Sequence, residues 1–315
     1  MVNQLYAFFM ILKKTVLVFT FLSFFTLICC TSKDDAIEEL PVKIEEEDNN
    51  EGDNLVNYAD IDFSIWKVTL PVDEDNNGSP DEYKPDELIN GKYRTIKAVQ
   101  PYMYDDTTDA SIVFYAFPLN ATANSKYSRT ELRELIKPSD SKVNWTLETG
   151  GTIVGKLKML EVSKDKSSSS EYHRVIVMQI HGVISIEDMQ KHGFSSNNGP
   201  PLIKMTWIDG DLWVYKKSLV NENTTGNNLL DVSSSTWTDE KYNMGTVGFN
   251  EFQFSIKATK GKIELQLNNE NPYIYEDISL AKWPFQNYYK AGNYLNTTDS
   301  GAFSKLKYYS LSVSH

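Results

Sequence analysis

Short runs in which apolar and polar residues alternate dominate the chain from residue 61 onward, and no long segment shows helical periodicity. Asp209-Gly210 separates two of these runs as a tight hairpin turn, and a turn around Gly261 separates another pair. Regularly spaced strands of this kind predict an all-β fold, either a two-sheet β-sandwich or a jelly roll. The runs with the strongest strand pattern are Gly151–Val162, Arg174–His181, Leu202–Ile208, Leu212–Lys217, Phe252–Ala258 and Ile263–Leu267.

Residues 1–30 have the pattern of a lipoprotein signal peptide. Two lysines precede an apolar run over residues 15–28, which is shorter than a typical membrane span. The run ends in Leu27-Ile28-Cys29-Cys30, which resembles the lipobox of bacterial lipoproteins with Cys30 as the lipidated residue. We therefore expect an exported outer-membrane lipoprotein that touches the membrane only through its lipid. An uncleaved membrane anchor and attachment at Cys29 are the alternatives.

Residues 31–56 are predicted to be a disordered acidic linker, so the folded domain is expected to span residues 57–315. Residues 31–60 carry two lysines and eleven acidic residues, which is most of the formal net charge of −12. The linker begins with Ser32-Lys33-Asp34-Asp35, which resembles a signal that sends some lipoproteins to the outer face of the outer membrane. A plain solvated linker is the alternative. No cysteine follows Cys30, so a core without disulfides must hold the domain together.

The segment Ser128–Glu134 places Arg129, Glu131 and Arg133 on one face of an extended strand. Two guanidinium groups braced by a carboxylate suit the capture of substrate carboxylates. The alternative is an outward-facing charged strand whose ion pairs contribute little to stability.

The segment 174–181 ends in an amide and an imidazole on one face. Strict alternation puts Ile176, Met178 and Ile180 on one side, and Gln179 and His181 on the other. Imidazole is the commonest general base near neutral pH, although a lone strand histidine is more often structural.

A third segment, 288–294, places Tyr288, Lys290, Gly292 and Tyr294 on one face. The missing side chain at Gly292 is predicted to leave room for a ligand between a cation and a phenol. The alternative is an aromatic-rich surface strand.

Together the three segments resemble the alginate lyases of polysaccharide lyase family 7. The resemblance rests, in order, on Arg129-Thr130-Glu131-Leu132-Arg133, on Gln179-Ile180-His181 and on Tyr288-Tyr289-Lys290-Ala291-Gly292-Asn293-Tyr294. It covers the chain from about residue 56. Family members often have Phe where this chain has Tyr289, and Gln where it has Asn296.

The resemblance implies a catalytic jelly roll with a concave substrate groove that cleaves alginate by β-elimination. Arg129 and Gln179 would neutralise the uronate carboxylate, and His181 would take the C5 proton of guluronate. Tyr294 would protonate the leaving oxygen, and would also act as the base on mannuronate. Neighbouring sugars would contact Glu131, Arg133, Tyr288 and Lys290. Within the family, Ile180 accompanies a preference for guluronate-containing blocks. We expect a monomer that needs no metal or cofactor and binds no nucleic acid.

Three other functions remain open from the sequence. A non-catalytic glycan-binding surface lipoprotein needs aromatic and cationic residues but no Gln179, His181 and Tyr294 together. A glycoside hydrolase needs two carboxylates flanking the bond, whereas Glu131 lies between arginines. A lyase for another polyuronate, such as glucuronan, would use the same machinery. Residues 182–201 are predicted to form a long loop that could cap the groove.

Overall fold

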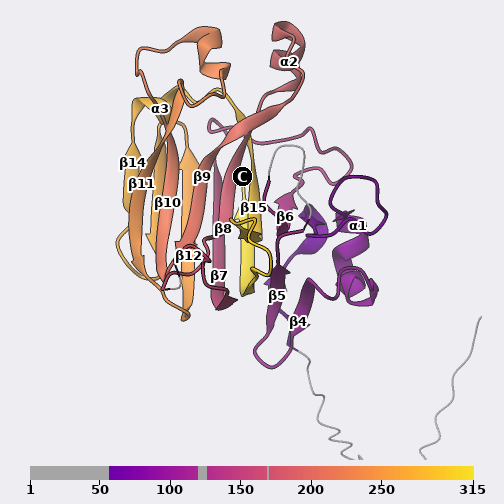
Figure 1. Cartoon of the computed structure of the whole chain (residues 1–315). Coiled ribbons are helices and arrows are strands. Elements are labelled where there is room, and N and C mark those ends of the chain that lie inside the picture. The colour runs from indigo at the N-terminus through magenta and orange to yellow at the C-terminus, as the bar shows by residue number, and fades with distance from the viewer. Residues whose placement is uncertain (1–56, 120–125, 169) are drawn as a thin grey trace, which may run out of the picture. The chain divides into compact units, whose positions relative to one another are not determined.

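Two β-sheets pack face to face in the computed structural model, which describes residues 57–119, 126–168 and 170–315 (Figure 1). The first sheet has the order β14 (Tyr273–Glu276), β13 (Lys262–Leu267), β12 (Glu251–Thr259), β7 (Gly151–Val162), β16 (Ser304–Ser314), β5 (Ser111–Ala116) and β4 (Met103–Asp106), and β1 (Asp60–Ile61) pairs with β16. The second has the order β11 (Trp237–Thr246), β10 (Asp211–Leu219), β9 (Asn198–Ile208), β8 (Val175–Val183), β15 (Gln286–Leu295), β6 (Arg129–Glu134), β2 (Trp66–Thr69) and β3 (Glu82–Tyr83). The predicted all-β sandwich is confirmed.

Helices are short and lie at the ends of strands. They are α1 (Pro85–Leu88), α2 (Ile186–His192), α3 (Ile278–Ala281) and the 3-10 helices η1 (Phe63–Ile65), η2 (Ile89–Thr95) and η3 (Gly226–Leu230). Within the described part of the chain, no helix combines the length and apolar character that crossing a bilayer requires. The predicted signal peptide (1–30), its Cys30 and the predicted linker (31–56) lie outside the described residues.

The alternation read from the sequence corresponds to burial in the strands. Along most of β7, buried residues alternate with half-buried ones, because successive side chains point to opposite faces of a strand. Asp209 and Gly210 both have positive φ angles, 49° and 97°, as a type I′ hairpin between β9 and β10 requires.

A buried polar residue joins the two sheets behind the site. The amide of Asn293, on β15 of the second sheet, donates to the backbone oxygens of Phe114 and Ser304, on two strands of the first sheet. The Ser304 hydroxyl returns a hydrogen bond to Asn293 Oδ1 at 2.6 Å. Because every polar atom of this amide has a partner, its burial fixes the position of β15 without the cost of an unsatisfied group.

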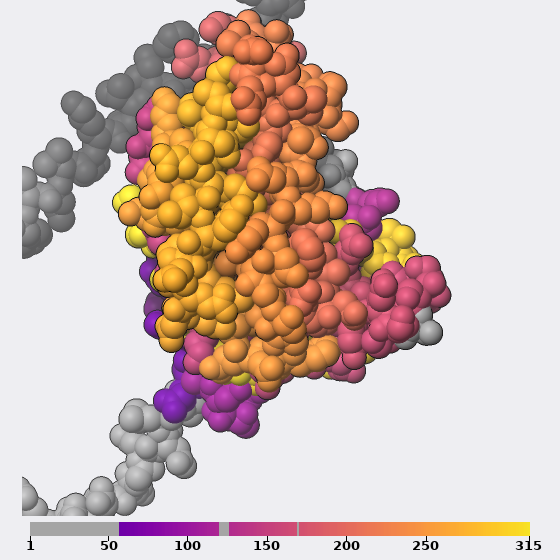
Figure 2. Space-filling model, turned by 90° about the vertical axis from the view of Figure 1, so that its left-hand side faces the viewer, coloured from indigo at the N-terminus to yellow at the C-terminus, as the bar shows by residue number. Residues whose placement is uncertain are grey.

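The sandwich is closed along the edge formed by β11 and β14. Tyr242 on β11 stacks on Tyr273 on β14 with ring centroids 3.6 Å apart. Figure 2 looks onto this side of the molecule and shows a continuous orange and yellow surface there.

The prediction of a long loop over residues 182–201 is wrong. Strand β8 continues to Val183, α2 spans Ile186–His192, and β9 begins at Asn198. Ser185 caps α2 by accepting a hydrogen bond from the Asp188 backbone N–H, and Gly193 ends it in the left-handed conformation. These two cap residues were the sequence signal for the helix.

Candidate active site

A groove of about 590 Å³ lies on the face of the second sheet that is turned away from the core. Its floor is built from β6, β15 and β8, and residues of β2, β9 and β10 extend it. Seven of the eight predicted site residues line the groove: Arg129, Arg133, Gln179, His181, Tyr288, Lys290 and Tyr294. The eighth, Glu131, is buried directly beneath them.

Strand register places these side chains in rows that cross the sheet. Lys290 on β15 is paired with Gln179 on β8 and with Arg133 on β6. The row continues to Lys204 on β9 and to Lys67 on β2. Neighbouring strands lie about 4.8 Å apart, so the row presents cations at a spacing suited to a polyanionic chain lying across the strands.

A second row holds the tyrosine predicted to be the proton donor. Tyr294 is paired with Arg129 on one side and with Ile176 on the other. The Arg129 guanidinium carbon lies 4.0 Å from the centroid of the Tyr294 ring. Nε of Arg129 is buried and has no hydrogen-bond partner among the described residues. The guanidinium is thus held by the phenol ring with a donor still available.

Glu131 is the centre of the polar network under the groove. Its carboxylate lies 2.5 Å from Lys290 Nζ and 3.3 Å from Arg129 Nη1, and it accepts a hydrogen bond of 2.6 Å from Gln179 Nε2. Burial acts to raise the pKa of Glu131, but Lys290 and Arg129, with hydrogen bonds from Lys290 and Gln179, hold it below its ordinary value. Glu131 is therefore an ionised positioning group and has no proton to give.

The partners of Glu131 differ from the sequence prediction in one respect. Glu131 was expected to lie between two arginines, but its second cation is Lys290, from another strand. Arg133 instead lies over the Tyr288 ring, 4.1 Å from its centroid, and donates to the Ser141 carbonyl. A strand pattern shows which residues share a face, but not which neighbouring strand supplies a counter-ion.

His181 is held in a neutral form with a defined tautomer. Its Nδ1 lies 2.9 Å from the Gly182 carbonyl oxygen, which can only accept, so Nδ1 carries the proton and Nε2 keeps a lone pair. The imidazole stacks on the Tyr288 ring with centroids 5.1 Å apart. Burial, and then the charge of Lys290, lower the pKa of His181 to about 3. The ring is thus unprotonated at neutral pH, with the Nε2 lone pair available.

The charge of Lys290 is also affected by the groove. Burial lowers the pKa of Lys290 to about 8, against the raising effect of Glu131. Lys290 therefore remains mainly protonated at neutral pH, although a small further fall in its pKa would remove much of the charge. Burial likewise raises the pKa of Tyr288, which keeps that phenol protonated.

The predicted faces of the 174–181 segment are wrong at its start. A β-bulge interrupts the pairing of β8 with β9 between Ile176 and Met178. As a result Ile176 lines the groove with Gln179, whereas Val177 joins Met178 in the core. One extra residue in a strand reverses the alternation on one side of it.

The predicted role of Gly292 is also wrong. Its φ of 136° is one that residues with side chains rarely adopt, and a Cβ there would lie 2.7 Å from the Thr130 carbonyl oxygen. The absent side chain therefore allows β15 to approach β6 closely, and does not open space for a ligand. Gly292 lies within the bulged stretch between Ala291 and Tyr294.

Sequence reasoning missed several groove residues. Lys67, Lys204 and Lys217 line it, with Glu82 paired to Lys67 at 2.6 Å. The signal was present for the lysines of β9 and β10, since each alternates with core residues in a recognised strand. Residues 198–201, at the start of β9 in the segment read as a loop, also line the groove.

Comparisons with known proteins agree with this geometry. A family model described as alginate lyase matches residues 61–315. An alginate lyase of Klebsiella pneumoniae is 28% identical over 143 residues, 38% of this chain and 44% of that protein, so the aligned part spans less than half of that relative.

Two solved structures show a similar fold over most of the chain. Alginate lyase A1-II′, described as a member of polysaccharide lyase family 7, is 30% identical with a TM-score of 0.60, covering 81% of this chain and 96% of that one. A double variant of A1-II′, with a histidine changed to asparagine and a tyrosine to phenylalanine, was solved with the substrate GGMG. It is 28% identical with a TM-score of 0.59, covering 81% of this chain and 94% of that one.

Proposed function

The chain belongs to the alginate lyase family, polysaccharide lyase family 7, and we propose that it cleaves alginate by β-elimination, leaving an unsaturated 4-deoxy uronate at the new non-reducing end. One observation carries the proposal. A neutral imidazole, a tyrosine and a cationic cluster braced by a buried carboxylate line the same groove.

The first requirement of the reaction is neutralisation of the uronate carboxylate. The proton on C5 is only weakly acidic while the adjacent carboxylate keeps its charge. Arg129, Lys290 and Arg133 bring three positive charges, of which Glu131 compensates one. The groove floor therefore keeps a positive surplus for a substrate carboxylate. Gln179 donates one amide hydrogen to Glu131 and has a second for the substrate. Such fixed donors stabilise the enolate-like charge as it develops.

The second requirement is a base for the C5 proton. His181 has its Nε2 lone pair free of a proton, and its ring is fixed by Gly182 and Tyr288. A ring that is already neutral spends no free energy on deprotonation before the reaction. On guluronate His181 takes the C5 proton.

The third requirement is a proton for the departing glycosidic oxygen. A phenol O–H can donate a proton, so Tyr294 can act as the donor. On mannuronate, where the C5 configuration is inverted, Tyr294 serves as base and acid. The relative solved with GGMG has a histidine and a tyrosine replaced, which is consistent with these two residue types at the reacting bond.

The groove chemistry disfavours hydrolysis. A glycoside hydrolase uses two carboxyl groups on either side of the scissile bond. Among the described residues that line the groove, the only carboxylate is Glu82, and it is ion-paired with Lys67. Glu131 lies beneath the floor, 1% exposed, and is ionised.

Guluronate-containing blocks are the proposed preferred substrate. Ile180 is fully buried in the core and faces away from Gln179 and His181, so any effect on block preference is indirect, through packing behind β8. Ile176 contacts the groove directly beside Tyr294 and gives that part of the floor an apolar surface.

We also propose that the protein is exported as a monomeric outer-membrane lipoprotein attached through Cys30. The supporting feature is the lipobox-like Leu27-Ile28-Cys29-Cys30 sequence after an apolar run. Metabolic labelling with a fatty acid tests this: the label should be lost in Cys30→Ala and retained in Cys29→Ala. The reverse pattern would move the attachment to Cys29.

One assay tests the catalytic proposal against its rivals. Alginate, polyguluronate, polymannuronate and glucuronan are incubated with the protein, and the ultraviolet absorbance of unsaturated uronate and the number of reducing ends are followed. A lyase raises both on alginate, fastest on polyguluronate. Reducing ends without absorbance would indicate a hydrolase, and binding without either would indicate a glycan-binding protein. Preferential cleavage of glucuronan would change the substrate class.

A further inference from the structure

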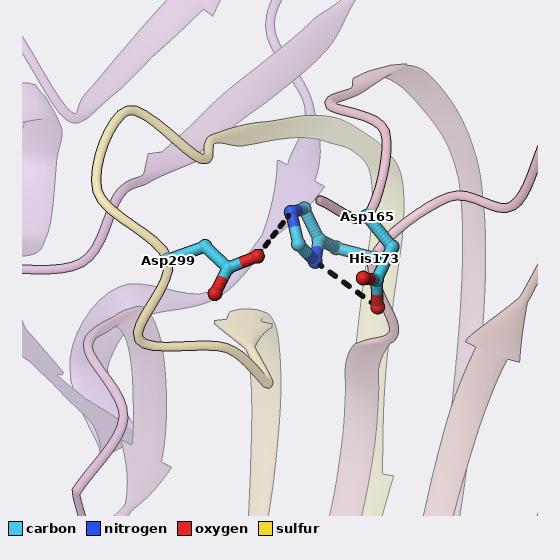
Figure 3. Close-up of side chains that lie close together, drawn as sticks. All are labelled: Asp165, His173 and Asp299. Carbon is cyan, nitrogen blue, oxygen red and sulfur yellow. Dashed lines mark ion pairs between the residues drawn. The ribbon is translucent and has the colours of Figure 1, made fainter. Parts of the chain in front are cut away.

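A second cluster of reactive side chains lies outside the catalytic groove. His173 lies between the carboxylates of Asp165 and Asp299 (Figure 3). One ligand atom from each of the three side chains lies within 4.8 Å of the others. Asp165 and His173 belong to the connection between β7 and β8, and Asp299 to the connection between β15 and β16.

The imidazole of this histidine is buried and makes no hydrogen bond within the described residues. Its side chain is 3% exposed, yet Nδ1 lies 3.9 Å from Asp165 Oδ2 and Nε2 lies 3.7 Å from Asp299 Oδ2. Both distances are longer than a hydrogen bond. Within the described residues, neither ring nitrogen has another polar partner. Buried polar groups in proteins are normally paired, so an imidazole whose nitrogens lie 3.7 and 3.9 Å from the nearest carboxylates can take a further ligand at one of them.

The spacing suits a small divalent cation. Ligands about 2.0–2.2 Å from a tetrahedral zinc ion lie about 3.4 Å apart, and here one ring nitrogen and one oxygen of each carboxylate lie within 4.8 Å of one another. Asp165 and Asp299 are about one-third exposed, so rotation of their carboxylates can close the difference. One imidazole nitrogen with two carboxylate oxygens is a donor set that favours Zn²⁺ over Ca²⁺ or Mg²⁺.

The surroundings of the cluster are acidic. The adjoining pocket, about 560 Å³, is lined by Asp165, Glu171, Asp209 and Asp211, with Arg174 as its one permanently charged basic residue. This balance attracts a cation and differs from that of the catalytic groove, which is cationic.

The two connections that supply the ligands are already joined at both ends. Ser163 donates its backbone N–H to the Phe303 carbonyl at 2.9 Å, and Asn296 donates to the Arg174 carbonyl at 2.9 Å. The cluster lies between these two tethers, so the backbone holds the ligands near one another without a metal. Asn296 follows Tyr294 by two residues and also lines the catalytic groove.

We propose that Asp165, His173 and Asp299 bind a zinc ion that ties the β7–β8 connection to the β15–β16 connection beside the groove. The ion is structural. Its free energy of binding would add to the stability of the folded state, because the ligands converge only after folding.

The test measures bound metal, not activity. The untagged chain is stripped with chelator, incubated with excess Zn²⁺ and dialysed, and its metal content is measured by mass spectrometry alongside its melting temperature. We expect Asp299→Asn to hold one equivalent of zinc less than the wild type and to lose the rise in melting temperature that zinc gives. Glu171→Gln is the matched control, because it removes one charge from the same pocket without removing a ligand.

The comparison between variants separates this site from others. Asp73, Asp75 and Asp81 also lie close enough to hold a cation, but that contribution is the same in the wild type and in Asp299→Asn. Asp165→Asn gives an independent loss of the same equivalent if Asp299→Asn does not fold. Equal zinc content in the wild type and both variants would overturn the proposal. So would a chain that retains no zinc.

Discussion

Replacing Glu131 with glutamine removes the negative charge that holds the groove floor together. The side chain of Glu131 is 1% exposed and that of Lys290 10%, with 2.5 Å between the charged atoms. Breaking a buried ion pair by removing one partner costs about 3–5 kcal/mol, because the remaining charge has no counter-ion. We expect the free energy of unfolding to fall by about that amount, a large share of the roughly 5–15 kcal/mol of a typical domain.

The same change should alter the charge of Lys290. Burial already lowers its pKa to about 8, and Glu131 is the largest influence acting in the opposite direction. Without the carboxylate we expect the pKa of Lys290 to fall further, so that the amine is largely uncharged at neutral pH. The value of kcat/KM on alginate should then fall and recover partly as the pH is lowered.

Urea denaturation at neutral pH measures the stability difference, with Glu82→Gln as a matched control. Glu82 pairs with Lys67 at 2.6 Å, but its side chain is 46% exposed, so its loss should cost about 0–1 kcal/mol. Adding Lys290→Met to Glu131→Gln should restore part of the lost stability, because it removes one of the two cations left without their carboxylate, while Arg129 remains. The reasoning fails if Glu131→Gln costs no more than Glu82→Gln, or if the second substitution restores nothing.

Further predictions concern single groups. Tyr294→Phe should abolish turnover on every block type while alginate binding persists. His181→Ala should reduce cleavage of polyguluronate more than of polymannuronate. Kinetics on both polymers test these expectations, and an active Tyr294→Phe variant would contradict the first. Because the folded pKa of His181 is about 3, below its ordinary 6.5, the unfolded chain binds more protons between these values. His181 should therefore destabilise the fold progressively as pH falls from about 6.5 toward 3, and His181→Ala should flatten the measured stability over that window. Gly292→Ala should lower the melting temperature, because its Cβ meets backbone at 2.7 Å; an unchanged melting point would refute this. Burial acts to lower the pKa of His315, but the ion pair with Glu134 at 2.6 Å raises this pKa above its ordinary value overall. The pair therefore stabilises the fold fully below the pKa of the unfolded chain, and this stabilisation is lost as pH rises through the pKa of the folded protein. His315→Gln should remove that loss from a pH series of unfolding measurements.

The strands could be predicted from the sequence because alternation is a local property. All six runs identified from pattern coincide with β7, β8, β9, β10, β12 and β13 within a few residues. The same-face groups Arg129 with Arg133, and Gln179 with His181, also lie together in the groove. In each case the two residues are separated by an even number of positions within a regular stretch of strand.

Pattern reasoning failed where the backbone departs from regular geometry. The bulge after Ile176 brings that residue into the groove, and the positive φ of Gly292 serves close packing against β6. Neither the bulge nor the positive φ angle can be inferred from the residue composition of its segment. Both depend on how adjacent strands fit, which the residues of one strand do not specify.

The sequence by itself determined the two-sheet class, most strand positions and most of the residue types that line the groove. Only the tertiary structure decided that Glu131 pairs with Lys290, that Lys67 and Lys204 extend the cationic row, and that Asp299 approaches His173. Side-chain direction is set within a strand by its period of two. Contacts between strands depend on sheet order and register, and these follow from packing of the whole domain.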